Sequence, residues 1–164
     1  MTDIVTIHSI QLREMTRDDL PIFFEQQLDQ EANYMAAFTA KDPSDHQAFD
    51  GHWGKILADK GIRIRTILYD GQVTGSVLCH AWGGEPEISY WLGKEFWNRG
   101  IATRGLALFL DVVPVRPLYA RVAKDNIASI RVLEKNGFAL SGEGKWYSNA
   151  RGKEIDELVW VRKE

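Results

Sequence analysis

Apolar and polar residues alternate along much of the chain, and this period of two predicts β-strands. The clearest case is residues 62–82, where two alternating runs flank Asp70-Gly71, a favoured two-residue hairpin turn. These runs therefore predict a β-hairpin. Similar patterns predict further strands at residues 4–15, 87–92, 118–123, 139–147 and 154–164.

Four segments carry the start and stop residues typical of helices. Thr16 and Ser44 are the expected N-caps of the first two helices, and Gly61 is the expected end of the second. Asn126 lies near the start of the last helix. The four predicted helices cover residues 15–31, 41–61, 102–111 and 125–138.

The order of these elements predicts a mixed α/β domain, in which strands first meander and are later separated by helices. The chain has 164 residues, of which 45% are hydrophobic, so it can bury a core of its own. The sequence contains no internal repeat, linker or low-complexity segment. Residues 1–164 are therefore expected to form one domain.

The charge and hydropathy of the chain disfavour two classes of protein. The net charge is −3 at pH 7, whereas a general nucleic-acid binder normally presents a basic surface. No apolar run approaches the length that spans a membrane, and the N-terminus lacks the pattern of a signal peptide. We therefore expect a cytoplasmic protein that binds neither nucleic acid nor membranes.

Cysteine and histidine offer little for a metal site. Cys79 is the only cysteine and lies in an apolar alternating run, so it is expected to be a core thiol. His8 and His80 lie in predicted strands without partners at metal-ligand spacing. The sequence therefore predicts no metal site and no disulfide.

Residues 97–103 join a predicted strand to a predicted helix and contain Gly100. Glycine lets a ligand approach the backbone closely, and a helix start offers free N–H groups and the positive end of the helix dipole. Such a loop can bind phosphate, and Arg99 adds charge at its rim. An ordinary tight turn is the alternative. The glycine motifs of nucleoside-triphosphate and dinucleotide sites are both missing.

A second segment shares these features. Asn126 and Ser129 lie on the first turn of the last predicted helix, which directly follows a strand. An apolar helix face then leads to Lys135, Gly137 and Phe138. In combination with the glycine loop, this segment resembles the GNAT superfamily of acetyl-CoA-dependent N-acetyltransferases.

The resemblance rests on two motifs and one strand. Residues 97–102 match the family's phosphate loop, in which a glycine follows three residues after Gln, Arg or Trp and a small residue comes two later. Residues 126–138 match its second motif, N-x-x-S-x-x-x-x-E-K-x-G-F, and residues 87–92 resemble its fourth strand. Gly105 departs from the pattern, because a helix former is expected there. Within the superfamily the chain looks most like the ribosomal-protein alanine N-acetyltransferase type.

The resemblance implies a mixed, mostly antiparallel sheet of six or seven strands flanked by about four helices. In this family the fourth and fifth strands run parallel and splay apart, and the pantetheine arm of acetyl-CoA enters the gap. Backbone groups of the fourth strand are implied to pair with the arm, and amides of the loop to hold the pyrophosphate. The residues implied to bind the cofactor are Trp91, Leu92, Trp97, Asn98, Arg99, Gly100, Ile101, Ala102, Thr103, Asn126 and Ser129.

The implied reaction is attack of a neutral amine on the thioester, which needs a base, oxyanion stabilisation and protonation of the thiolate. Glu87, in the strand beside the gap, is the expected base, directly or through water, with Glu85 as the alternative. The resemblance makes Ser129 the expected acid, with Tyr147 as the alternative. A solvent-facing Glu87 and a Ser129 that only caps its helix are the non-catalytic interpretations. Ser148 stands where relatives carry a carboxylate.

The resemblance places the acceptor pocket beside the first two helices. There His46, His52 and Trp53 form either a packing face, which is the favoured interpretation, or an aromatic wall. The tryptophans expected in the core or the pocket wall are Trp82, Trp146 and Trp160.

The expected acceptor is a primary amine, either a protein N-terminus or a small molecule, and the expected assembly is a monomer or a homodimer. A rival hypothesis from another class is a non-catalytic acyl-CoA-binding or regulatory module on the same fold.

Overall fold

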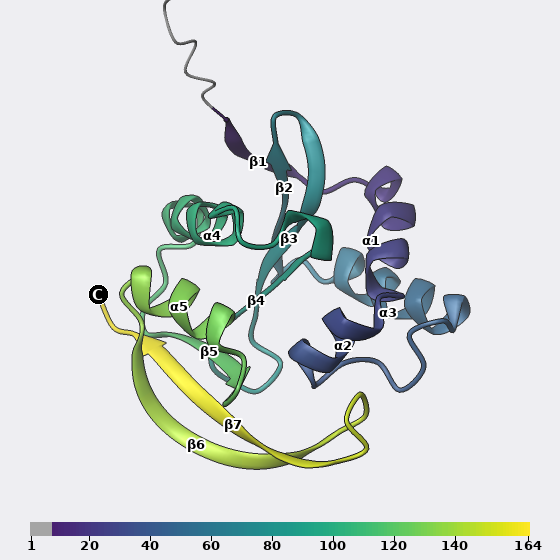
Figure 1. Cartoon of the computed structure of the whole chain (residues 1–164). Coiled ribbons are helices and arrows are strands. Elements are labelled where there is room, and N and C mark those ends of the chain that lie inside the picture. The colour runs from purple at the N-terminus through teal and green to yellow at the C-terminus, as the bar shows by residue number, and fades with distance from the viewer. Residues whose placement is uncertain (1–7) are drawn as a thin grey trace, which may run out of the picture.

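Seven strands form one mixed sheet in residues 8–164, the part of the chain that this computed structural model describes (Figure 1). The spatial order is β1-β2-β3-β4-β5-β7-β6, and every neighbouring pair is antiparallel except β4 and β5. The predicted strands are present, although residues 4–7 of the first lie outside the described residues. The strands are β1 (Ile10–Glu14), β2 (Arg63–Tyr69), β3 (Gln72–His80), β4 (Glu87–Leu92), β5 (Leu118–Ala123), β6 (Ala139–Ser148) and β7 (Lys153–Arg162).

Five α-helices accompany the sheet within the same residues, because the first predicted helix is divided in two. Asp29 ends the continuous run: its carboxylate accepts the Ala32 N–H at 2.8 Å and starts a new helix. The helices are α1 (Leu20–Gln27), α2 (Gln30–Ala36), α3 (His46–Ala58), α4 (Ile101–Val112) and α5 (Ile127–Lys135), with short 3-10 turns η1 (Arg17–Asp19) and η2 (Lys94–Phe96).

The predicted caps of α3 are wrong by a few residues. Asp45 is the N-cap, and its carboxylate accepts the Ala48 N–H at 3.0 Å. The Ser44 hydroxyl instead donates to Asp42 at 2.6 Å. The helix ends at Ala58 rather than at Gly61.

Two core clusters lie on the two faces of the sheet. Figure 1 shows α4 and α5 on one side of the sheet and α1 and α3 on the other. Helices α4 and α5 cover one face, where Phe109 and Leu133 pack on buried strand residues such as Ile88. Helices α1 and α3 cover the other face, where Phe23 and Trp53 form a second hydrophobic cluster with Leu78 of β3. Side chains at successive positions of β4 therefore face different layers.

Strands β4 and β5 separate after a short contact. Their parallel pairing comprises Glu87 with Tyr119 and Ile88 with Ala120, whereas β4 pairs with β3 along its whole length. The predicted splay is thus confirmed. Beyond Ile88 the two strands are no longer paired.

Gly105 has a packing reason. A Cβ atom at this position of α4 would lie 3.2 Å from the Cδ1 atom of Ile67 on β2, which is closer than ordinary contact. The helix therefore approaches the sheet closely at the cost of about 1 kcal/mol of helix propensity.

The cysteine and the tryptophans differ in how deeply they are buried. Cys79 and Trp160 are buried in the core. Trp53 packs with Phe49 in the second core, as the predicted packing face of α3 requires, whereas His46 and His52, which were predicted on the same face, are exposed. Trp82 and Trp146 are each 56% exposed, so neither belongs to the core. None of the helices within residues 8–164 is long and apolar enough to cross a bilayer.

Candidate functional site

A cleft of about 460 Å³ lies where β4 separates from β5. Its walls come from the end of β4, the loop before α4, the first turn of α4, one side of α5 along its length, and α2. The structure brings together ten of the eleven residues expected at the cofactor, and Arg99, which is exposed, is not among the lining residues. Those ten are Trp91, Leu92, Trp97, Asn98, Gly100, Ile101, Ala102, Thr103, Asn126 and Ser129.

The loop before α4 has the backbone geometry of an anion site. Gly100 is the N-cap of α4 and adopts the left-handed conformation with φ +74°, and no atom lies within 4 Å of the place its Cβ would occupy. The first N–H groups of α4 have no partner inside the helix and carry the positive end of its dipole. The Trp97 indole donates to the Leu92 carbonyl at 3.0 Å and fixes the loop to β4.

The cleft is also lined by two basic side chains and by part of α2, neither of which was predicted from the sequence. Arg131 and Lys135 lie four residues apart on α5 and line the cleft, so they present two positive charges along one helix face. Met35 and Ala36 of α2 line it too. The basic pair was visible in the sequence as a spacing of four, but the wall depends on tertiary packing.

The start of α5 is held by Asn126. Its side-chain oxygen accepts the Ser129 N–H at 3.3 Å, and its amide nitrogen donates to the Met35 carbonyl at 3.2 Å. The first bond caps α5, and the second joins its start to α2. The Ser129 hydroxyl lies 2.6 Å from the hydroxyl of Tyr90 on β4, a residue that the sequence analysis did not select.

Glu87 lies on the opposite face of β4 from Tyr90 and does not line the cleft. Its carboxylate is 3.5 Å from Arg121 Nε and 4.0 Å from His80 Nε2. Arg121 also contacts the buried Glu157 on β7, with Nη1 3.2 Å from Oε1. The group therefore has two carboxylates and one guanidinium.

The protonation of this group follows from its burial. Burial raises the pKa of the Glu87 carboxyl above its usual range, although the Arg121 charge opposes the shift. Burial likewise raises the pKa of Glu157, against hydrogen bonding by Arg121. The pKa of His80 is lowered because its charged form is desolvated. Glu87 is thus a carboxylate with increased basicity, as general bases are.

The alternative catalytic residues do not face the cleft. Glu85 is exposed in the turn before β4. Tyr147 is 61% exposed on β6 and does not line the cleft. Ser148 is fully buried and donates to the Ala37 carbonyl at 2.6 Å, so it holds the end of β6 against the segment after α2.

Aromatic rings extend from the Glu87 group toward α3. The Trp82 ring stacks on the His80 ring with centroids 4.4 Å apart. The His52 ring approaches Trp82 edge-on at 6.2 Å, and the pKa of His52 is lowered by burial. His46 instead contacts Phe24 of α1 and belongs to the packing side.

Comparison with known proteins identifies the class. A family model described as an acetyltransferase (GNAT) domain matches residues 9–139, so the chain belongs to the GNAT family and is an N-acetyltransferase. A curated relative, the L-amino acid N-acetyltransferase AaaT of Escherichia coli K12, is 27% identical over 143 residues, which cover 79% of this chain and 83% of the relative.

Solved structures share the fold at lower identity. The ribosomal L7/L12 α-N-protein acetyltransferase RimL, in complex with coenzyme A, is 21% identical with a TM-score of 0.75, covering 94% of this chain and 93% of that chain. RimJ of Mycobacterium smegmatis is 22% identical with a TM-score of 0.78, covering 94% and 81%. The expected fold of the ribosomal-protein type is confirmed.

Enzymes of this family use acetyl-CoA, and the cleft fits that group. The open, left-handed Gly100 lets a pyrophosphate reach the α4 N–H groups without a side chain between them. The Trp91 indole N–H is buried and has no hydrogen-bond partner within the described residues. The basic pair on α5 suits an anionic cofactor.

Proposed function

We propose that the chain transfers the acetyl group of acetyl-CoA directly to a primary amine, which is a protein N-terminus or a small molecule. The observation that carries the proposal is the splay of β4 and β5 between a phosphate-type loop and a basic carboxylate. The thioester would lie in the gap beside Ser129, which lines the cleft from the α5 layer, while Glu87 lies on the other face of β4.

Removal of the amine proton is the step that most needs the protein. An α-amine with a pKa near 8 is roughly one-tenth neutral at pH 7, and a lysine-type amine near 10.4 is far less so. Glu87 takes this proton, directly or through water, as the N–C bond forms. Glu87 and Glu157 share the single guanidinium of Arg121, and this excess of carboxylates favours an incoming ammonium group.

Departure of the thiol completes the transfer. When the C–S bond breaks, its electron pair goes to sulfur, and the Ser129 hydroxyl donates its hydrogen there. Serine regains a proton from water, and Glu87 releases the amine proton to water. The products are the N-acetyl amine and coenzyme A with its free thiol.

The similar proteins act on different amines, so they do not select one acceptor for this chain. AaaT is named for an L-amino acid, RimL for a ribosomal protein, and a Vibrio cholerae neighbour, 16% identical, for spermidine. The residues that would meet the acceptor lie around Glu87, Trp82 and Trp146. The two exposed tryptophans favour an amine with an apolar or aromatic part next to it.

Replacement of Glu87 tests the proposed base. Glu87→Gln removes the base and keeps the shape, so we expect turnover to fall about 100-fold or more with acetyl-CoA affinity nearly unchanged. Because the carboxyl pKa is raised, wild-type turnover should decline with falling pH from above the usual carboxyl range, and the variant should lack this limb. Thiol release from acetyl-CoA measures both.

Glu143→Gln is the matched control, because Glu143 is an exposed carboxylate on β6 that pairs with Lys124 and does not line the cleft. It should behave as the wild type. Equal turnover and equal pH profiles in Glu87→Gln and the wild type would overturn the assignment of the base. Tight binding of acetyl-CoA with no transfer to any amine would favour a non-catalytic binding module.

A further inference from the structure

Tyr90 makes the closest side-chain contact of Ser129. Its hydroxyl lies 2.6 Å from Ser129 Oγ and 3.3 Å from the Ser129 carbonyl oxygen. The two residues are 39 positions apart and come from β4 and α5, which lie together in the centre of Figure 1. Both line the cleft.

We propose that Tyr90 is a positioning residue for the transfer: its hydroxyl donates to Ser129 Oγ and so directs the serine hydrogen into the cleft, toward the leaving sulfur. This inference rests on the proposed function. It goes beyond the sequence motifs, which place Tyr90 in the fourth strand without linking it to Ser129.

Either hydroxyl can donate across this contact, and the proposal gives the donor role to Tyr90, whose single hydrogen then goes to Ser129 Oγ rather than to the Ser129 carbonyl oxygen. Burial raises the pKa of Tyr90 to about 12, although the bond to Ser129 opposes the shift, so Tyr90 keeps its proton at neutral pH. A serine hydroxyl has one hydrogen and two lone pairs. When a lone pair accepts from Tyr90, the hydrogen of Ser129 is free for another acceptor.

An acceptor for the hydrogen of the Ser129 hydroxyl would lie in the cleft, because Ser129 lines it. Its N–H is already held by Asn126, which fixes the first turn of α5. The serine lines the cleft beside the end of β4. A sulfur atom that gains an electron pair there would therefore meet a preoriented donor.

The same bond makes Ser129 a better acid. As Ser129 gives its hydrogen to sulfur, negative charge develops on Oγ, and the Tyr90 donor stabilises it across the 2.6 Å contact. No atom beyond those of the proposed transfer is required. Tyr90 itself does not touch the thioester in this account.

The first test needs no turnover. Coenzyme A is bound to the protein, and the thiol is titrated by the ultraviolet absorbance of its thiolate. We expect the bound thiol pKa to lie below that of free coenzyme A in the wild type, and to rise by about half to one unit in Tyr90→Phe and in Ser129→Ala. In the double variant, Tyr90→Phe should add nothing to the Ser129→Ala shift.

The second test uses turnover. Tyr90→Phe should lower kcat about tenfold and leave the KM for acetyl-CoA nearly unchanged, with no further loss in the Ser129→Ala background. Tyr69→Phe is the matched control, because Tyr69 packs against the same core and does not line the cleft. It should match the wild type in both tests.

The outcomes separate the two proposals. An unchanged thiol pKa in Tyr90→Phe, or a shift that persists without Ser129, would overturn the role of Tyr90 even if transfer is observed. If Tyr90→Phe does not fold, 3-fluorotyrosine at position 90 replaces it, because this more acidic phenol should lower the thiol pKa instead. Absence of transfer to any amine would contradict the proposed function while the thiol titration still tests Tyr90.

Discussion

At the scale of single residues, the site depends on backbone conformations that few side chains allow. Gly100 combines a positive φ with open space in front of it, and Asn98 two residues earlier also has a positive φ of 62°. Such positions can be identified in a sequence because the requirement is local. The contact between Tyr90 and Ser129 was not identifiable in this way, since it depends on how β4 and α5 pack.

Gly100→Val tests the loop. A branched side chain at this φ adds strain and stands between the pyrophosphate and the α4 N–H groups. We expect acetyl-CoA affinity, measured by calorimetry, to fall about 100-fold or more, as the loss of one or two charge-assisted hydrogen bonds predicts.

Gly152→Val controls for strain alone. Gly152 lies in the turn between β6 and β7 with φ +66° and open space around it, so the substitution has the same backbone penalty far from the loop. Its acetyl-CoA affinity should equal that of the wild type. A Gly100→Val protein that binds acetyl-CoA as the wild type does would refute the loop assignment.

At the scale of elements, predictions succeeded where one strong local pattern determined the boundaries. Residues 87–92 and 118–123 form β4 and β5 as predicted, because each is a short apolar or alternating run bounded by turn residues. The first helix was predicted as one element over residues 15–31, whereas the structure breaks it at the Asp29 cap and continues α2 to Ala36. The α2 wall of the cleft was missed because it depends on tertiary packing.

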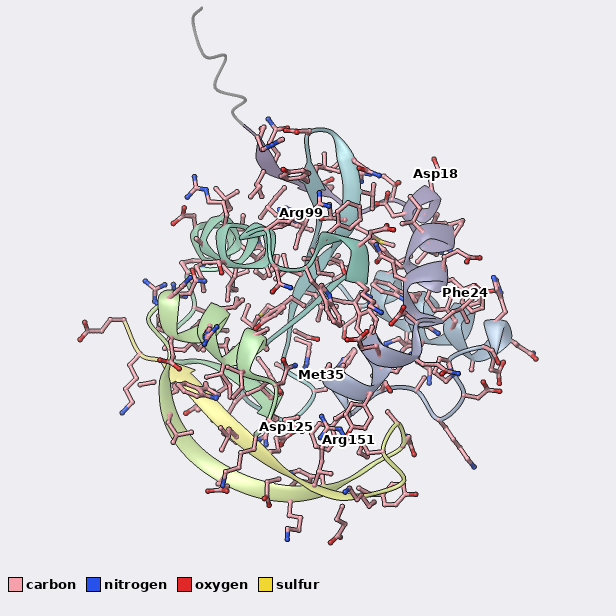
Figure 2. All side chains as sticks on the ribbon, viewed as in Figure 1. Asp18, Phe24, Met35, Arg99, Asp125 and Arg151 are labelled. Carbon is pink, nitrogen blue, oxygen red and sulfur yellow. The ribbon has the colours of Figure 1, made fainter. Side chains whose placement is uncertain are left out.

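The turn between β6 and β7 is fastened to the elements around the cleft. Arg151 makes two bonds to Asp125, at 2.6 and 2.8 Å, and its Nε donates to the Tyr34 carbonyl at 2.9 Å. Figure 2 shows Arg151, Asp125 and Met35 near one another where α2 meets the start of α5. Asp125 directly precedes Asn126, so this contact supports the residue that caps α5.

Arg151→Lys should loosen this contact. Lysine keeps the charge but loses the planar fork that pairs with a carboxylate, and the Arg151 side chain is 5% exposed. We expect the free energy of unfolding in urea to fall by about 1–2 kcal/mol. Lys145→Ala, at an exposed β6 residue, is the control and should change it little. Equal stability of Arg151→Lys and the wild type would show that the fork contributes nothing.

At the scale of the whole molecule, one buried carboxylate links the start of the chain to the sheet. Asp19 of η1 accepts two bonds from Arg13 and one from the Thr66 hydroxyl of β2. Burial alone would raise the Asp19 pKa, but these bonds and the Thr16 N–H outweigh it and lower the pKa below its usual value. The stabilisation is therefore present above the pKa of an unfolded aspartate and is lost as pH falls through the folded value.

Asp19→Asn should reveal this linkage. At pH 7 we expect a loss of about 2–3 kcal/mol in the free energy of unfolding, since a buried charge-assisted network loses its anion. The difference from the wild type should begin to shrink as the pH falls below about 4, where the unfolded aspartate takes up a proton. It should be lost once the pH is below the lowered pKa of the folded carboxyl. Asp18→Asn, at the exposed neighbour labelled in Figure 2, should cost little at any pH. A pH-independent difference for Asp19→Asn would contradict the linkage.

The measurement that tests the central claim most directly is mass spectrometry of amines incubated with the protein and acetyl-CoA, together with the thiol released. The panel holds peptides with N-terminal Ala or Ser, polyamines, free amino acids and aromatic amines. We predict one class of acetylated amine, formed in equal amount to free coenzyme A, and none of it with Gly100→Val. Thiol release without an acetylated amine, or equal transfer by Gly100→Val, would contradict the account.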